Sequence, residues 1–333
     1  MRRLRSSAVI LAAALLLIAV AAPTPHRAGQ QFADFSYAPP MRPHLMDDEG
    51  QWRQPFIYPL RLVDRLEHRF VEDRAHPVTL RWWTGGTLLS ADSPGGPWLP
   101  LGGDPLGRDV FSRLLEGGRM SLGVAGVAAA VALLLGTAIG ALAGFHGGWL
   151  DRTLMRAADF VLVLPAIYVV IVLRASLPLV LTTGEVFWTL ASVLALAGWP
   201  QPARGVRAII RSERRQEYAE AALASGAGWW RILHRHLLPA TAGFLRVQAT
   251  LLLPAFILAE ATLSFVGFGF AEPTPSWGVM LQDAAQAGVL IEAPWLAVPA
   301  AAVAVSVLLL SSATGRSSHR SAPATRRQAI SNQ

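Results

Sequence analysis

Two pairs of side chains within residues 217–236 have types and spacing that could do chemistry. Glu217 and Glu220 lie three residues apart, which places both carboxylates on one face of a helix, as an acid–base pair would need. The neighbouring arginines favour instead an exposed pair of ionised carboxylates. His234 and His236 are two residues apart, so they do not share a helix face, and no third ligand is adjacent. We therefore expect no catalytic residue and no metal site.

Two residue types are missing from the chain. It has no cysteine, which excludes disulfides, thiolate catalysis and cysteine metal sites. It also has no lysine, so all 29 basic residues counted as Lys plus Arg are arginines. An ATP-binding P-loop needs a lysine that reaches the β- and γ-phosphates. The sequence therefore indicates a non-enzymatic chain that needs no cofactor and does not hydrolyse ATP itself.

The composition is that of a membrane protein. Hydrophobic residues make up 53% of the chain and charged residues only 15%, and the mean hydropathy is +0.39. A helix needs roughly 20 apolar residues to cross a bilayer, and we predict an all-α polytopic membrane protein with six transmembrane helices. The predicted spans cover residues 8–22, 121–145, 160–181, 185–200, 244–268 and 294–310. Arginines beside the spans account for the formal charge of +7, so nucleic-acid binding is not expected.

The placement of arginine predicts the orientation of these spans. Arginine is densest in residues 204–235 and recurs in the C-terminal tail, as is typical of cytoplasmic segments. We expect a multi-pass protein of the inner membrane with both termini in the cytoplasm. We predict an N-terminal transmembrane helix at residues 1–22, with a cleaved signal peptide as the alternative. A periplasmic segment 23–118, a transmembrane domain 119–313 and a cytoplasmic tail 314–333 should follow. The transmembrane domain includes a cytoplasmic loop at residues 204–243.

The predicted periplasmic segment is rich in Pro, Trp, Asp and Arg. Its one helix-like stretch runs from Leu60 to Val71. Two roles are equally consistent with Trp82, Trp83 and Trp98. Their rings stack on a peptide or sugar, or they lie at the membrane interface.

A few residues stand out inside the predicted spans. Glu260 must face protein or a watery cavity because an ionisable group is costly in lipid; we favour a packing hydrogen bond over a role in the transport pathway. Arg174 either reaches the outer interface or faces the bundle. Gly136, Gly140 and Gly144 recur every four residues, which predicts a seam where another helix packs closely.

Residues 217–237 predict two short helices that meet at glycines. Good helix formers precede Gly226 and Gly228, which lie where a helix would end. A second helix is expected after Gly228 and should stop before Pro239. The two helices would form a compact knob on the cytoplasmic side.

This knob resembles the EAA loop of ABC importer permeases. The matching residues are Glu220-Ala221-Ala222, Gly226 after three more residues, and Leu238-Pro239. His236 stands where the family pattern has isoleucine, and the Arg235-His236 version is similar to the dipeptide, oligopeptide and nickel branch. Segments 101–113, with Gly103 in place of the usual threonine, 147–151, 258–269 and 275–278 also resemble that branch.

The resemblance implies a fold, a role and partners. The loop would be a coupling helix that docks on an ATPase subunit, and its ATPase-coupling residues would be Glu217, Glu220, Ala221, Ala222, Gly226, Leu238 and Pro239. The partners would be a second homologous permease, two ABC ATPase subunits and a periplasmic or lipid-anchored substrate-binding protein. The cargo would be peptides or related small solutes, with nickel chelates and microcin-like compounds included.

Other functions remain open from the residues alone. One is an enzyme acting in the membrane, for which we find no convincing nucleophile, metal cluster or carboxylate dyad. A secondary transporter driven by an ion gradient would need internal repeats and broken helices at mid-membrane. We find no convincing repeat, and Glu260 is a lone candidate carrier. A membrane anchor without a transport role is another alternative, and the polar knob argues against it.

Overall fold

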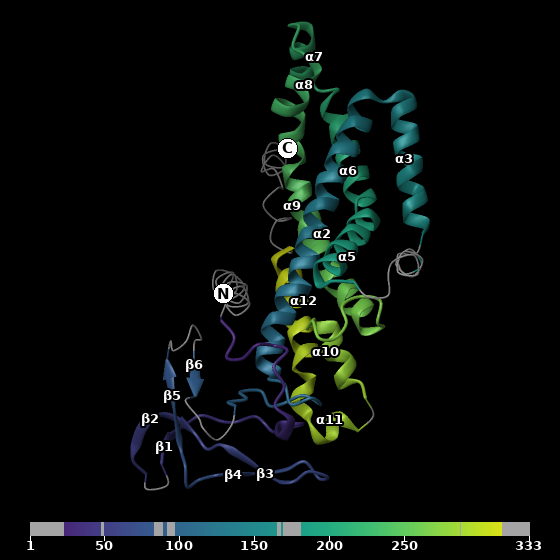
Figure 1. Cartoon of the computed structure of the whole chain (residues 1–333). Coiled ribbons are helices and arrows are strands. Elements are labelled where there is room, and N and C mark those ends of the chain that lie inside the picture. The colour runs from purple at the N-terminus through teal and green to yellow at the C-terminus, as the bar shows by residue number, and fades with distance from the viewer. Residues whose placement is uncertain are drawn as a thin grey trace, which may run out of the picture.

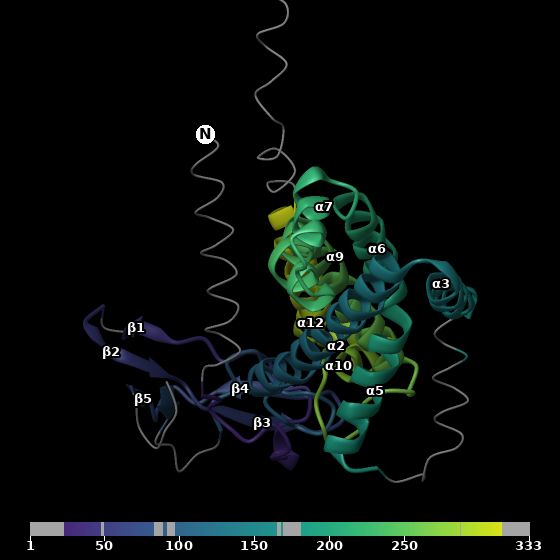
Figure 2. The same cartoon turned by 90° about the horizontal axis from the view of Figure 1, so that it is seen from above.

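The computed structural model describes residues 23–47, 50–82, 89–91, 97–164, 168, 181–286 and 288–314. It shows an elongated bundle of helices, with β-strands beside one end and the short helices α7 and α8 at the opposite end (Figure 1). Seen from above, the strands lie to one side of the bundle and α3 lies on the other side (Figure 2). The predicted first span, most of the predicted third span with Arg174, and the tail beyond residue 314 lie outside the described residues.

The bundle is arranged around α2, which packs against α5, α6 and α9. In chain order the helical elements are α2 (Val110–His146), α3 (Gly148–Val163), α5 (Thr183–Gly198), α6 (Pro200–Glu213), α7 (Glu217–Ala224), α8 (Trp229–Ile232), η2 (Leu233–Leu237), α9 (Leu238–Phe265), α10 (Trp277–Ala284), α11 (Val289–Glu292), η3 (Pro294–Ala297) and α12 (Val298–Thr314).

Within the described residues, three helical stretches are long and apolar enough to cross a membrane: Val110–His146, Leu238–Phe265 and Pro294–Ser312. They contain or overlap the spans predicted at 121–145, 244–268 and 294–310. The helix Thr183–Gly198, at the fourth predicted span, is apolar but shorter.

The glycine seam predicted in α2 is confirmed. A Cβ added at Gly140 would lie 2.4 Å from the carbonyl oxygen of Ala203, and one at Gly144 would lie 2.8 Å from the carbonyl oxygen of Arg207. Gly136 has similarly little space, with the Cβ of Pro202 at 2.7 Å from the added atom. Helix α6 therefore packs backbone against backbone on α2, as small residues allow.

Pro200, the last residue of the fourth predicted span, begins a new helix. Helix α5 ends at Gly198, and α6 starts at Pro200 in its first turn, where the missing N–H of proline costs nothing. Residues 204–213, expected to belong to a polar loop, form the rest of α6.

Residues 23–118, which were predicted to be periplasmic and are called the outer segment below, correct two expectations. The chain is mostly helical but not all-α. It forms β1 (His44–Met46), β2 (Trp52–Ile57), β3 (Leu60–Asp64), β4 (Arg69–Glu72), β5 (Val78–Trp82) and β6 (Leu89–Ala91). The helix expected from Leu60 to Val71 is wrong, because β3 and β4 form an antiparallel hairpin there. Burial alternates along β3 as in a strand, and the carboxylate of Asp64 accepts the N–H groups of Leu66 and Glu67 in the turn.

The other four strands form one sheet in the order β1-β2-β5-β6. Its core contains Ile57, Leu80, Leu99 and Trp98, which is only 9% exposed. Trp98 thus packs in the core of the outer segment, whereas Trp83 and the side chain of Trp82 lie outside the described part of the chain.

Candidate functional site

The residues of the EAA-like loop are brought together in a knob at one end of the bundle (Figure 1). Helix α7 carries Glu217, Glu220, Ala221 and Ala222, and α8 follows after a tight corner. The expectation of two short helices meeting at glycines is confirmed.

Gly226 forms that corner. Its φ angle is +78°, in the left-handed region that glycine adopts without strain. The N–H of Ala227 donates to the carbonyl of Ala222 at 3.1 Å, as in the Schellman motif that ends many helices. A Cβ on Gly226 would meet nothing within 4 Å. The glycine is therefore needed for its backbone conformation, not for space.

The knob sits on an apolar base built from four elements. Ala219 of α7 and Ile232 of α8 are fully buried. They pack in one cluster with Phe145 of α2 and with Val206 and Ile210 of α6. The knob is thus fixed to the ends of α2 and α6, and a push on it must reach those helices.

One face of the knob is exposed to solvent. Glu217, Glu220 and Ala221 are exposed. Trp229 is 47% exposed and Trp230 is 58% exposed, which is high for indole side chains. The described residues contain no group of three His, Cys, Asp or Glu side chains that could hold a metal ion. The exposed tryptophans suit this face to contact with a protein.

Tyr218 braces α7 on the end of α6. Its hydroxyl donates to Glu213 at 2.6 Å, and this hydrogen bond raises the pKa of Tyr218 to about 12. The tyrosine therefore stays neutral at physiological pH.

The second helix of the knob does not stop before Pro239, contrary to our expectation. Helical backbone continues from α8 through the π-helical turn η2 into α9. The N–H of Leu238 donates to the carbonyl of Leu233, one residue further back than in an α-helix. This wider turn accommodates Pro239, which has no N–H to donate and would clash in a regular α-helix. The result is one continuous helical path from the knob into the membrane.

Glu260 lies on that path, inside α9, and is fully buried. The hydroxyl of Ser264 donates to its Oε1 at 2.7 Å. Ser121 and Ser276 lie beside the same carboxyl group, but its Oε2 has no hydrogen-bond partner among the described residues. Ser264 also accepts the N–H of Phe270 at 3.1 Å. Glu260 is therefore linked through Ser264 to the turn that follows α9, and Ser121 of α2 lies beside it.

At the other end of the bundle, five charged side chains form a network that sequence reasoning missed. Arg108 Nε lies 2.6 Å from Asp104 Oδ2, and Arg113 Nη2 lies 2.7 Å from Glu272 Oε1. Arg108 also pairs with Glu272, and both guanidinium groups face Asp283 at 3.8 and 3.9 Å. Although both arginines are almost fully buried, each is paired with carboxylates, as buried charges must be.

The sequence held one signal of this network. The segment 101–113, which resembles the importer permeases, contains Asp104, Arg108 and Arg113. Glu272, which pairs with the two arginines, lies 159 residues beyond Arg113. Spacing along the chain does not reveal such a pair.

Comparison with known proteins agrees with this arrangement. Residues 136–327 match the model of the family described as binding-protein-dependent transport system inner membrane component. A peptide permease protein of Brucella ovis is 38% identical over 211 residues, which cover 63% of this chain and 68% of the relative. The oligopeptide transport system permease protein of Bacillus subtilis is 36% identical over 208 residues (62% and 66% of the two chains), and the dipeptide transport system permease protein of the same organism is 41% identical over 183 residues (55% of each).

The family match covers more than half of the chain and includes the whole knob. The resemblance seen in the EAA-like loop is therefore confirmed, and the chain is a transport subunit rather than an enzyme. The chain belongs to the binding-protein-dependent transport system inner membrane components, the permease subunits of ABC importers.

Proposed function

We propose that this chain is the translocation subunit of an importer for peptides or related small solutes, nickel chelates included. The relatives named above are peptide, oligopeptide and dipeptide permeases. The observation that carries the proposal is the knob: an exposed α7 with a rigid glycine corner, seated on α2 and α6 and continuous with α9.

The knob is the proposed coupling helix. Glu217, Glu220, Ala221 and Ala222 would meet a groove on an ATPase subunit, and Gly226 would set the angle between the two short helices. Closure of two ATPases around ATP would then pull the knob. Because Ala219 and Ile232 are buried against α2 and α6, that pull would rotate those helices rather than bend the loop.

Leu238 and Pro239 have a different proposed role, at the junction with α9. They follow the π-helical turn and would carry the motion of the knob along α9 toward Glu260. We assign Glu260 a structural role, because the serines that lie beside it belong to three separate elements. Arg174 remains a candidate for an interfacial or bundle-facing charge.

We further propose six spans with both termini in the cytoplasm. The three long apolar helices and the shorter α5 supply four of the six, and residues 1–22 and 160–181 would supply the other two. The segment 23–118 would then lie outside, and the loop 204–243 and the tail 314–333 inside, in agreement with the arginine distribution.

The complete importer would contain a second homologous permease, two ATPases and a periplasmic or lipid-anchored substrate-binding protein. The binding protein would deliver cargo to the outer end of the bundle, where the strands lie. Cargo selection would rest mainly with that protein.

The test is deletion of residues 217–228 in the assembled importer. We expect membrane insertion to remain and substrate-stimulated ATP hydrolysis to be lost. The milder variant Glu220→Arg reverses one exposed charge on the proposed docking face, and Glu67→Arg makes the same change in the outer segment as a matched control. Normal substrate-stimulated ATP hydrolysis in the deletion variant would contradict the proposal.

Loss of uptake on adding a protonophore, with ATP held constant, would favour an ion-driven transporter instead.

A further inference from the structure

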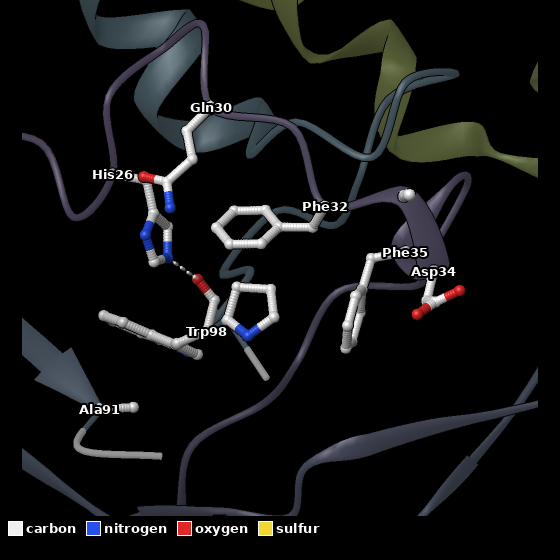
Figure 3. A pocket seen from close by; sticks show the side chains of 9 residues that line it. His26, Gln30, Phe32, Asp34, Phe35, Ala91 and Trp98 are labelled. Carbon is white, nitrogen blue, oxygen red and sulfur yellow. Dashed lines mark hydrogen bonds between the residues drawn. The ribbon is translucent and has the colours of Figure 1, made fainter. Parts of the chain in front are cut away.

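The outer segment contains a cavity of about 470 Å³ between the N-terminal stretch and the four-stranded sheet (Figure 3). This volume lies within the range of about 300–1,000 Å³ that is usual for small-ligand pockets. Aromatic rings of His26, Phe32, Phe35 and Trp98 line much of it, and Ala91 lies at its border. The coupling mechanism proposed above makes no use of it.

The aromatic wall of the cavity is held in place before any ligand arrives. The ring of Phe32 meets His26 edge-on at 5.2 Å and Phe35 at 6.5 Å between centroids. The ring of His26 is hydrogen-bonded through Nε2 to the carbonyl oxygen of Trp98 at 2.9 Å. A ligand would therefore lose little free energy in ordering these side chains.

The same wall is anchored to the membrane bundle. The N–H of His26 donates to Ser112 Oγ at 3.1 Å, at the start of α2. The N–H of Phe32 donates to the carbonyl of Gly107 at 3.3 Å, and a Cβ on Gly107 would lie only 2.0 Å from the carbonyl oxygen of Phe32. The cavity is thus built against the outer end of the transmembrane domain.

The last strand in the sheet order reaches the cavity with its final residue. Among the described strands, β6 is last in the sheet order and pairs only with β5, so no described strand covers its other edge. Ala91, which borders the cavity, is the last residue of β6. An extended peptide can add to such an edge by backbone hydrogen bonds while a neighbouring pocket takes one of its side chains.

The charges at the rim bear on which peptide would fit. Asp34 lines the rim, but its carboxylate is paired with Arg65, and both side chains are exposed. The described residues of the rim therefore offer no unbalanced charge for a free terminus, while the rings favour a bulky apolar or aromatic side chain.

We infer that the cavity between β6 and residues 26–35 is a binding site for an extended peptide, which pairs with the edge of β6 and inserts one large apolar side chain between Phe32, Phe35 and Trp98. The inference takes its ligand class from the proposed peptide transport. It adds a peptide site on the permease itself, outside the membrane.

The test uses the full-length chain in lipid nanodiscs and a capped pentapeptide with a central benzoylphenylalanine flanked by two threonines on each side. Irradiation should attach the probe to fragments that contain Phe32, Phe35 or Trp98. The same peptide with a central phenylalanine should compete about tenfold better than one with a central glycine. Methylation of the backbone nitrogens beside the central residue should also weaken competition, because it removes edge hydrogen bonds.

Two tryptophan substitutions, one in the cavity and one outside it, test whether labelling depends on the cavity. Ala91→Trp fills the cavity and should lower labelling about tenfold, whereas Val63→Trp places the same ring on an exposed position of β3 and should leave labelling unchanged. If Ala91→Trp does not fold, Phe32→Ala should lower labelling by removing part of the wall. Equal labelling of the filled variant and the parent, or labelling confined to other fragments, would overturn the inference.

The outcome is separable from that of the proposed function. Labelling uses the chain alone, whereas uptake needs the assembled importer. Specific labelling without ATP-coupled uptake would overturn the transport proposal and keep the peptide site, and uptake without specific labelling would do the reverse.

Discussion

Arg113, in the first turn of α2, donates from Nη2 to Oε1 of Glu272 at 2.7 Å, across 159 residues of sequence. The arginine side chain is only 1% exposed. Burial alone would raise the pKa of Glu272, but the hydrogen bond from Arg108 and the charge of Arg113 outweigh it and hold the pKa below its usual value. This pair ties the turn after α9 to the base of α2.

Replacement of Arg113 by methionine should strongly destabilise the protein. The change keeps most of the apolar stem but leaves Glu272 and Asp104 without one of their cations, and breaking a buried ion pair in this way costs about 3–5 kcal/mol. Thermal unfolding of the purified protein in detergent would measure the loss.

The matched control is Arg65→Met, which removes the partner of Asp34. Arg65 is 77% exposed and Asp34 is 61% exposed, and such surface pairs contribute about 0–1 kcal/mol. Similar losses for both variants would show that the network at Glu272 contributes no more than a surface pair.

Asp283 should make the unfolding free energy rise as the pH falls from 7 to 5. Burial, with the nearby carboxylates of Glu272 and Asp104, raises the pKa of Asp283 to about 6 from 3.8, although Arg113 and Arg108 oppose the shift. The folded protein therefore binds a proton there more readily than the unfolded chain does. Full titration corresponds to a gain on the order of 3 kcal/mol at most.

Asp283 and Glu272 affect the unfolding free energy in different pH ranges. The pKa of Glu272 is lowered, so its contribution is present above its unfolded value of 4.5 and is lost only as the pH falls below it. Between pH 7 and 5, the gain should vanish in Asp283→Asn, which is neutral throughout. A variant that still gains stability over this range would show that another group takes up the proton.

Gly140 should tolerate no side chain. A Cβ there would lie 2.4 Å from the carbonyl oxygen of Ala203, so Gly140→Ala must push α6 away from α2, at a cost of about 1–3 kcal/mol. Because the knob sits on both helices, coupled ATP hydrolysis should also fall. Unfolding temperature and substrate-stimulated ATPase activity measure the two effects.

Gly126 provides the control on the same helix. A Cβ at Gly126 would meet nothing within 4 Å, and alanine is the better helix former by about 1 kcal/mol. Gly126→Ala should therefore leave stability unchanged or raise it. If both variants lose stability equally, the loss comes from the helix itself and not from the seam with α6.

Features that depend on neighbouring residues along the chain were predicted correctly from the sequence. The period of Gly136, Gly140 and Gly144 predicted a helix seam, and Gly226 marked a helix end by its chemistry alone. The knob followed from the same local signals and from the resemblance to importer permeases.

What the sequence did not predict depends on contacts between distant segments or on a choice between two local structures. Leu60 to Val71 has enough helix formers to resemble a helix, but packing of Leu60 in the core of the outer segment favours a strand. Pro239 usually ends a helix, yet a π-helical turn lets the chain pass through it. The pairing of Arg113 with Glu272 could be found only in three dimensions.

Glu260 offers the sharpest test of structural against transport roles within the membrane. Glu260→Ala should destabilise the protein by about 2–5 kcal/mol, because it leaves a cavity and removes the acceptor of the Ser264 hydroxyl. Glu260→Gln keeps the shape and an oxygen that accepts from Ser264, so it should retain most of the stability. Thr262→Ala, two residues along α9 and exposed, should have little effect.

Uptake by the assembled importer then decides between the two roles. If Glu260 only joins α9 to its neighbours, uptake should follow the unfolding temperature, and Glu260→Gln should transport nearly as well as the parent. If its charge acts on the cargo or a coupled ion, Glu260→Gln should keep its unfolding temperature and lose uptake. We expect the first result, because the three serines that face Glu260 lie on α2, on α9 and directly before α10, the elements that a structural anchor would join.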